Sequence, residues 1–168
     1  LGLFFEKDYE PYSTEKHVQL DYIADGKDGN IYLRYIFGYN FYRYNIKENK
    51  FECIGSGRPD DIELGEPNQH YGLAIDENGV LWYTLSTMTE TFDWTTAYLI
   101  RWDVLNGEKK KNMGLIGTKE RSINIMAEMH YHNGVLYFTC GNHRFDVPGM
   151  FAVDAKKLEA LNYDLNED

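Results

Sequence analysis

The sequence predicts an all-β chain built from repeated four-stranded units, and three observations support this prediction. A hairpin signal, in which a strand-like run is followed by an Asp-Gly or Asn-Gly turn and a second run, occurs at Asp28-Gly29, Asn78-Gly79 and Asn133-Gly134. The three glycines recur at intervals of 50 and 55 residues. Aromatic residues make up 15% of the chain, including 14 tyrosines, which favours strands. A period of about 50 residues with four strands per unit is typical of β-propeller blades.

The expected strands follow one another in three blades, preceded by a short apolar segment at 1–5 that we interpret as the last strand of an earlier blade. We predict one propeller segment over 1–168, with blades at 18–54, 70–116 and 123–161. Their strands are expected at 18–24, 31–37, 42–45 and 51–54, at 70–75, 80–85, 98–103 and 113–116, and at 123–129, 135–140, 150–154 and 158–161.

Each blade carries an Asn or Asp directly after a large residue at the end of its third strand. The three pairs are Tyr44-Asn45, Trp102-Asp103 and Val153-Asp154. The side chains of Asn and Asp accept hydrogen bonds from backbone groups that follow them in a turn. We therefore expect these three residues to close the turns into the fourth strands and to have no catalytic role.

Three blades are fewer than the ~4 to 8 of a closed propeller. We therefore expect a partial propeller or half of an oligomeric ring, whose partners are the remaining propeller blades or a second copy of the chain. The chain begins with Leu instead of Met. We expect a processed form or a fragment, and the compartment stays open.

The stretch YGLAIDENGVLWYT at 71–84 resembles the blade signature of the streptogramin-lyase-like propellers, with NHL and SMP-30-type propellers as more distant relatives. The resemblance implies the propeller fold. It implies no activity, because the His and Glu residues that act with a magnesium ion in the lyase family have no matching positions here. On a propeller, the loops from second to third strands and from fourth strands to the next blade lie on one face, so we expect any site there.

The charge of the chain excludes two classes of partner. With 17 Lys and Arg against 27 Asp and Glu, the formal net charge is −10, which repels nucleic acid and anionic membranes. The dense cationic run Lys109-Lys110-Lys111 follows Asn106-Gly107 and is interpreted as a solvated hairpin tip. No apolar run approaches the ~20 residues of a membrane span. We expect neither nucleic-acid binding nor membrane insertion.

Aromatic and ionisable residues gather in the expected loops and predict a site for a small polar or carbohydrate-like ligand. Aromatic faces cover the C–H surface of a sugar, while charged groups bind its hydroxyl or acid groups. The expected ligand-binding residues are Tyr39, Asp93, Trp94, His143 and Asp146.

Two other classes of function stay open. In the enzyme hypothesis, His70 and Tyr71 at the start of the middle blade act with Arg58 or Arg144 in a uronate lyase or hydrolase, with the Arg neutralising the acid and the His or Tyr moving the proton. In the third hypothesis the chain is a protein-interaction scaffold.

We predict no cofactor, although a divalent metal stays possible. The residues of metal-binding type are His130, His132, Cys140 and His143. Spacing by two places His130 and His132 on one side of extended chain. However, we expect His132 to fall in the turn and Cys140 at the far end of the next strand, which would separate these groups.

Overall fold

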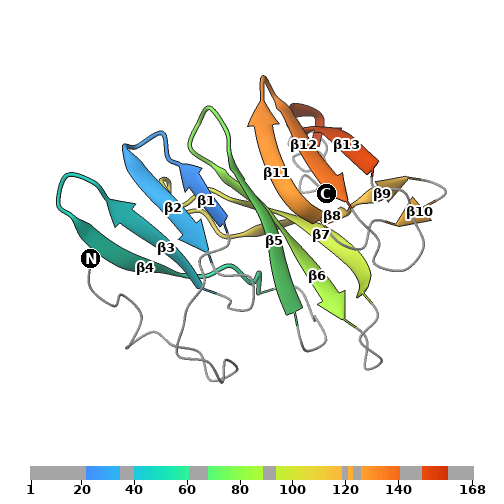
Figure 1. Cartoon of the computed structure of the whole chain (residues 1–168), viewed down its shortest axis with the longest axis horizontal. Helices are drawn as coiled ribbons and strands as arrows, with labels where there is room; N and C mark the ends of the chain where they lie inside the picture. Colours follow the sequence, from blue (N-terminus) through green and yellow to red (C-terminus); the bar gives the residue numbers. More distant parts are fainter. Residues whose placement is uncertain are drawn as a thin grey trace, which may run out of the picture.

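The computed structural model describes residues 22–34, 40–60, 68–88, 94–118, 121–122, 126–140 and 149–158. Within these ranges the chain is all-β, and it forms successive antiparallel sheets with the arrangement of blades in a partial β-propeller (Figure 1). No helix in the described ranges is long or apolar enough to cross a membrane.

The first blade is a four-stranded meander in the order β1-β2-β3-β4. Its strands are β1 (Tyr22–Asp25), β2 (Asn30–Arg34), β3 (Asn40–Asn45) and β4 (Lys50–Ser56). The second blade has the same topology. Its strands are β5 (Asn68–Ile75), β6 (Leu81–Met88), β7 (Trp94–Trp102) and β8 (Lys111–Leu115).

The third blade has three described strands in the order β11-β12-β13. They are β11 (Met126–His132), β12 (Val135–Cys140) and β13 (Gly149–Asp154). A two-stranded ribbon of β9 (Gly117–Thr118) and β10 (Arg121–Ser122), which the sequence did not predict, lies between the second and third blades along the chain.

The blades fan out with their first strands innermost (Figure 1), and β5 lies against both β1 and β11. The first hairpins of the three blades run in the same direction (Figure 1). The strand pairs nearest their turns are Asp25 with Ile31, Ile75 with Leu81, and His132 with Val135. The turns that follow the first strands therefore lie on one side of the molecule, at the top of Figure 1.

The middle blade is buried on both of its faces. Along β6, Leu81, Tyr83 and Leu85 pack in a cluster shared with the first blade, while Trp82 packs in a second cluster shared with the third blade. Side chains alternate between the faces of a strand, so a strand covered on both sides needs apolar residues at every position. This explains why 81–83 is continuously apolar.

An aromatic contact joins the first two blades. The ring of Phe41 lies 4.6 Å from that of Tyr83 and 5.8 Å from that of Trp102, between ring centroids. The Tyr83 hydroxyl donates to the carbonyl of Gly57, just after β4. Such aromatic pairs stabilise by about 0.5–1.5 kcal/mol beyond their area burial.

The predicted role of the Asn and Asp residues at the ends of the third strands is confirmed in the first and second blades, where the turns lead into β4 and β8. The side-chain Oδ1 atoms of Asn45, Asp103 and Asp154 each accept a hydrogen bond of 3.0 Å from a backbone N–H three residues later. In the third blade the result differs from the prediction, because Asp154 is followed by a helical turn at 155–158. Leu158, where the fourth strand was expected to begin, lies in this turn, since Asp154 caps a run without β-branched residues.

The hairpin glycines take the positive φ angles that the sequence predicted, with 79° at Gly29, 84° at Gly79 and 87° at Gly134. Asn133 also has a positive φ of 50°, as a type I′ turn requires. Asn78 does not. The turn at 76–80 is instead held by Asp76, so the predicted hairpin forms with a different turn.

The predicted segment at 1–5 lies outside the described residues, as do the expected strand positions 18–21, 35–37, 123–125 and 159–161.

Candidate functional site

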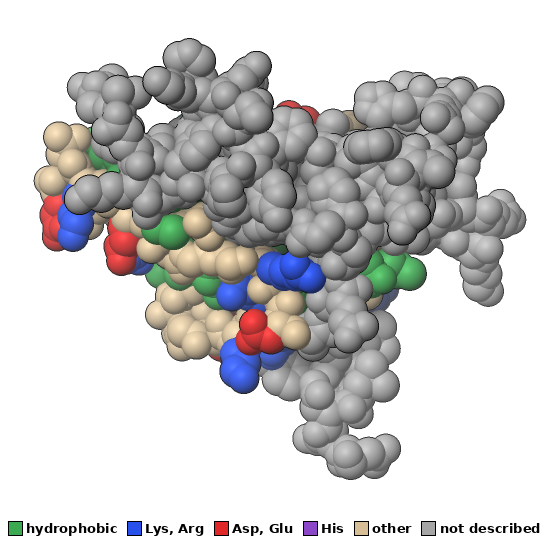
Figure 2. Space-filling view, turned by 90° about the horizontal axis from the view of Figure 1, so that it is seen from below, with side chains coloured by type: hydrophobic (Ala, Val, Ile, Leu, Met, Phe, Trp, Pro, Cys, Tyr) green, Lys and Arg blue, Asp and Glu red, His purple; other side chains and the backbone are tan. Residues whose placement is uncertain are grey.

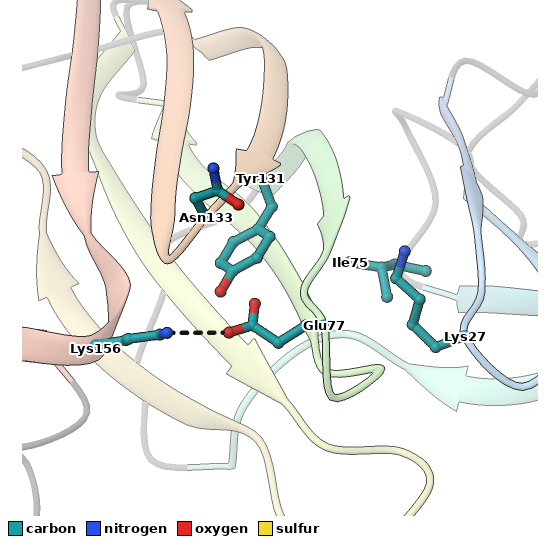
Figure 3. A pocket seen from close by; sticks show the side chains of 6 residues that line it. All are labelled: Lys27, Ile75, Glu77, Tyr131, Asn133 and Lys156. Atoms are coloured by element: carbon teal, nitrogen blue, oxygen red, sulfur yellow. Dashed lines mark ion pairs between the residues drawn. The ribbon is translucent and has the colours of Figure 1, made fainter.

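A cleft of about 440 Å³ opens where the turns of the three blades meet (Figure 3). The residues that line it come from all three blades. They are Lys27 of the β1–β2 turn, Ile75 at the end of β5, Glu77 of the β5–β6 turn, Tyr131 of β11, Asn133 of the β11–β12 turn and Lys156 of the helical turn after β13.

The cleft lies on the side of the turns between first and second strands, opposite the face on which the sequence analysis placed the ligand. Figure 2 shows the molecule from below, where the described residues present both basic and acidic side chains. β5 packs against both β1 and β11, which brings the turns after these three strands together, so residues far apart in sequence line one cleft.

Glu77 is held by the third blade. The Nζ atom of Lys156 lies 3.2 Å from its Oε1 atom, and the two form an ion pair (Figure 3). A hydrogen bond from the Tyr131 side chain, together with Lys156, lowers the pKa of Glu77 below its usual value. Burial, followed by the hydrogen bond to Glu77, raises the pKa of Tyr131. At neutral pH the cleft therefore contains an ionised carboxylate and a neutral phenol.

Asp76 fixes the turn that carries Glu77. It is 4% exposed, and its Oδ1 atom accepts hydrogen bonds from the backbone N–H groups of Asn78 at 2.8 Å and Val80 at 3.0 Å. Its Oδ2 atom accepts a third from the indole Nε1 of Trp82 at 3.0 Å. Groups on so constrained a turn are pre-positioned, which lowers the entropy lost on binding.

Lys27 and Ile75 form the side of the cleft nearest the first blade (Figure 3). Ile75 is 9% exposed and provides an apolar floor. Lys27 is exposed, and within the described ranges the structure shows no carboxylate paired with it. The cleft thus combines an apolar surface, a tyrosine ring, an amide and groups of both charges, which suits a small polar ligand.

The structure leaves the predicted catalytic set untested. The backbones of His70 and Tyr71 lie in β5, opposite Leu85 and Thr84, but their side chains are outside the description. Arg58 follows β4, is half-buried, and donates its backbone N–H to the Ser56 hydroxyl at 3.1 Å. Arg144 lies outside the described residues.

The predicted ligand-binding set is also untested. The backbone of Trp94 begins β7, opposite Met88. The other four residues lie outside the described residues; they are Tyr39, Asp93, His143 and Asp146. Their roles stay predictions.

The structure describes the metal candidates His130 and His132 and shows both exposed on β11. His132 does not lie in the turn as expected but is the last residue of β11, opposite Val135. Cys140 lies at the far end of the hairpin, opposite Met126, as predicted. Across the described ranges, no three His, Cys, Asp or Glu side chains are grouped so that they could hold a metal ion.

The sequence analysis did not propose any of the six residues that line the cleft as a site residue, and it named Asn133 only as part of a hairpin turn. One signal could have identified part of the set, because Lys27, Glu77 and Asn133 all lie in the turns of the recurring hairpins. Equivalent turns of successive blades meet on one side of a propeller. Tyr131 and Lys156 could be identified as cleft residues only from the three-dimensional arrangement of the blades.

Comparison with known proteins identifies no family. No family model matches the chain, and no curated protein has a significantly similar sequence. Among solved structures, the chain is similar to selenomethionine-substituted virginiamycin B lyase from Staphylococcus aureus, with 12% identity and a TM-score of 0.33. The match covers 78% of this chain and 54% of the lyase chain, so this chain spans about half the length of that structure.

Proposed function

We propose that this propeller segment binds a small polar, carbohydrate-like ligand in the cleft between its three blades. The observation that carries the proposal is the composition of the cleft, in which the buried Ile75 and the Tyr131 ring adjoin the Glu77 carboxylate and the Asn133 amide. A sugar presents C–H surface and hydroxyl groups side by side. Its C–H surface suits the first pair and its hydroxyl groups suit the second.

The size and construction of the cleft support a ligand of this class. Its volume of about 440 Å³ falls in the range of ~300–1,000 Å³ that is usual for small-molecule sites. Carboxylates have about four lone-pair sites. Glu77, although bound by Lys156 and Tyr131, therefore retains capacity for a ligand hydroxyl.

Amide chemical shifts in a ¹H–¹⁵N NMR titration with galactose, glucose and galacturonate test the proposal. We expect shifts concentrated at residues 27, 75–79 and 131–134, with dissociation constants on the order of millimolar for single sugars. Shifts confined to residues 58, 70–71, 93–94 and 143–146 would instead place the ligand on the predicted loop face, and the proposed cleft site would be wrong.

A matched pair of tyrosine variants sharpens the test. Tyr131→Ala removes the ring from the cleft, whereas Tyr137→Ala removes a half-buried ring from the other face of the same blade. We expect at least about a tenfold weaker affinity for Tyr131→Ala and no change for Tyr137→Ala. Circular dichroism checks that both variants fold. Equal affinities of the two folded variants would contradict the proposal.

A further inference from the structure

The charges of the cleft narrow the class of ligand, and this inference rests on the proposed function. The cleft is lined by two ammonium groups, on Lys27 and Lys156, and by one carboxylate, on Glu77. The chain as a whole has a formal net charge of −10. The side chains that line the cleft therefore carry a net positive charge on an acidic protein, and an acidic molecule bound there avoids part of the repulsion from the rest of the chain.

The two lysines are not equivalent. Lys156 lies 3.2 Å from Glu77 and is already paired. Lys27 comes from the opposite side of the cleft, next to Ile75 (Figure 3), and has no carboxylate partner within the described residues. An ammonium group forms its strongest hydrogen bonds with ionised acceptors.

The chain places Lys27 next to the turn that carries Glu77. A Cβ atom added at Gly79 would lie 3.8 Å from the Cβ atom of Lys27, so the β1–β2 and β5–β6 turns are in close proximity. The first blade thus brings to the cleft an ammonium group that has no carboxylate partner among the described residues, and the second blade brings a carboxylate that Lys156 already neutralises. A ligand with a carboxylate at one end and hydroxyl groups at the other suits this arrangement, because its carboxylate can meet the Lys27 ammonium group while its hydroxyl groups meet Glu77.

We infer that the ligand is a small hydroxylated carboxylic acid of the sugar-acid type, whose carboxylate is bound by Lys27 and whose hydroxyl groups face Asn133 and Glu77. Ile75 and Tyr131 cover its C–H surface. Lys27 is then the residue that distinguishes an acidic sugar from its neutral counterpart.

Galacturonate and galactose provide a matched pair of probes, because they differ in the carboxylate that replaces a hydroxymethyl group. At about 20 mM salt, we expect galacturonate to bind about five- to tenfold more tightly than galactose. The advantage falls at about 500 mM salt, since exposed charges are screened over a shorter distance there. Acetate, which has the carboxylate alone, binds more weakly than galacturonate.

Three lysine variants test whether Lys27 is the source of the preference for galacturonate over galactose. Lys27→Met removes the preference, so that this variant binds galacturonate no more tightly than galactose, and Lys27→Arg retains the preference. Lys47→Met is the control, because Lys47 is exposed in the β3–β4 turn and does not line the cleft.

The outcomes separate the two proposals. Equal affinity of the wild-type chain for both sugars, a preference that survives Lys27→Met, or acetate binding as tight as that of galacturonate overturns the sugar-acid inference while the cleft site stands. Absence of shifts at the cleft with either sugar overturns the proposed function itself.

Discussion

At the scale of single residues, two carboxylates with similar bonding differ in burial. Asp76 and Asp28 each follow a first strand, and each accepts three hydrogen bonds from residues of its own hairpin. Asp76 is 4% exposed, whereas Asp28 is exposed. A lost hydrogen bond costs most where the partner left behind cannot reach water.

We expect Asp76→Ala to lower the free energy of unfolding by about 3 kcal/mol, because the Trp82 indole N–H and the backbone N–H of Val80 are left buried without an acceptor. Asp28→Ala is the matched control, with an expected loss of about 1 kcal/mol. Urea unfolding followed by tryptophan fluorescence measures both. Equal losses would show that burial of the turn is not what makes Asp76 important.

Glu77 predicts a pH dependence of stability. Its pKa in the folded chain lies below the usual value of 4.5, so its stabilising contribution is present above about pH 4.5 and is lost as the pH falls through the folded pKa. In Glu77→Gln, the urea midpoint should fall less steeply with acidification from pH 5 to pH 3 than in the wild-type chain. Parallel curves for the two proteins would rule out this contribution.

At the scale of elements, the turn after each third strand depends on one side chain. Asp103 accepts the backbone N–H of Asn106 at 3.0 Å and its Nδ2 at 2.8 Å, and Asn45 plays the same role in the first blade. Asp103→Ala should lower the free energy of unfolding by about 1 kcal/mol. Asp103→Asn should lower the free energy of unfolding by only about a few tenths of a kcal/mol, because Asn keeps the accepting Oδ1. A loss from Asn as large as that from Ala would contradict this role.

Local patterns predicted the elements whose structure is determined locally. The hairpin glycines and the residues Asn45, Asp103 and Asp154 could be predicted because each acts within a few residues of itself. Leu158 was misassigned because an apolar residue after a capping Asp is compatible with a strand or a helical turn. The sequence pattern alone does not distinguish the two.

The candidate site could not be predicted in the same way. Lys27, Glu77, Tyr131 and Lys156 lie up to 129 positions apart in the sequence, and only the packing of the three blades brings them together. The sequence analysis favoured the expected loops of the other face, because aromatic and ionisable residues are concentrated in them. The proposed type of ligand rests on residue composition in both cases, whereas the position of the cleft could be found only from the packing of the blades.

At the scale of the whole molecule, the blades are joined by side chains that pack between sheets. Phe41 of the first blade lies against Tyr83 and Trp102 of the second, and all three belong to one cluster. Gly57, in the segment after β4, lies directly against the Phe41 ring and accepts the Tyr83 hydroxyl. Stability therefore depends on how closely this segment approaches the ring.

A methyl group at Gly57 tests the tightness of this contact. A Cβ atom there would lie 2.8 Å from Cδ2 of Phe41 and closer still to Cε2, too close for an unmoved ring, although the φ angle of Gly57 is not in the left-handed region. We expect Gly57→Ala to lower the free energy of unfolding by about 1–3 kcal/mol through overpacking between the blades.

Phe41→Leu removes the ring that the methyl group meets, so the two substitutions should not be additive. The double variant should be more stable than the sum of the single losses predicts, with a coupling of about 1 kcal/mol in a double-mutant cycle measured by urea unfolding. Strict additivity would mean that the Ala methyl is accommodated elsewhere. The contact between the first and second blades would then be looser than the packing of Phe41 against Tyr83 indicates.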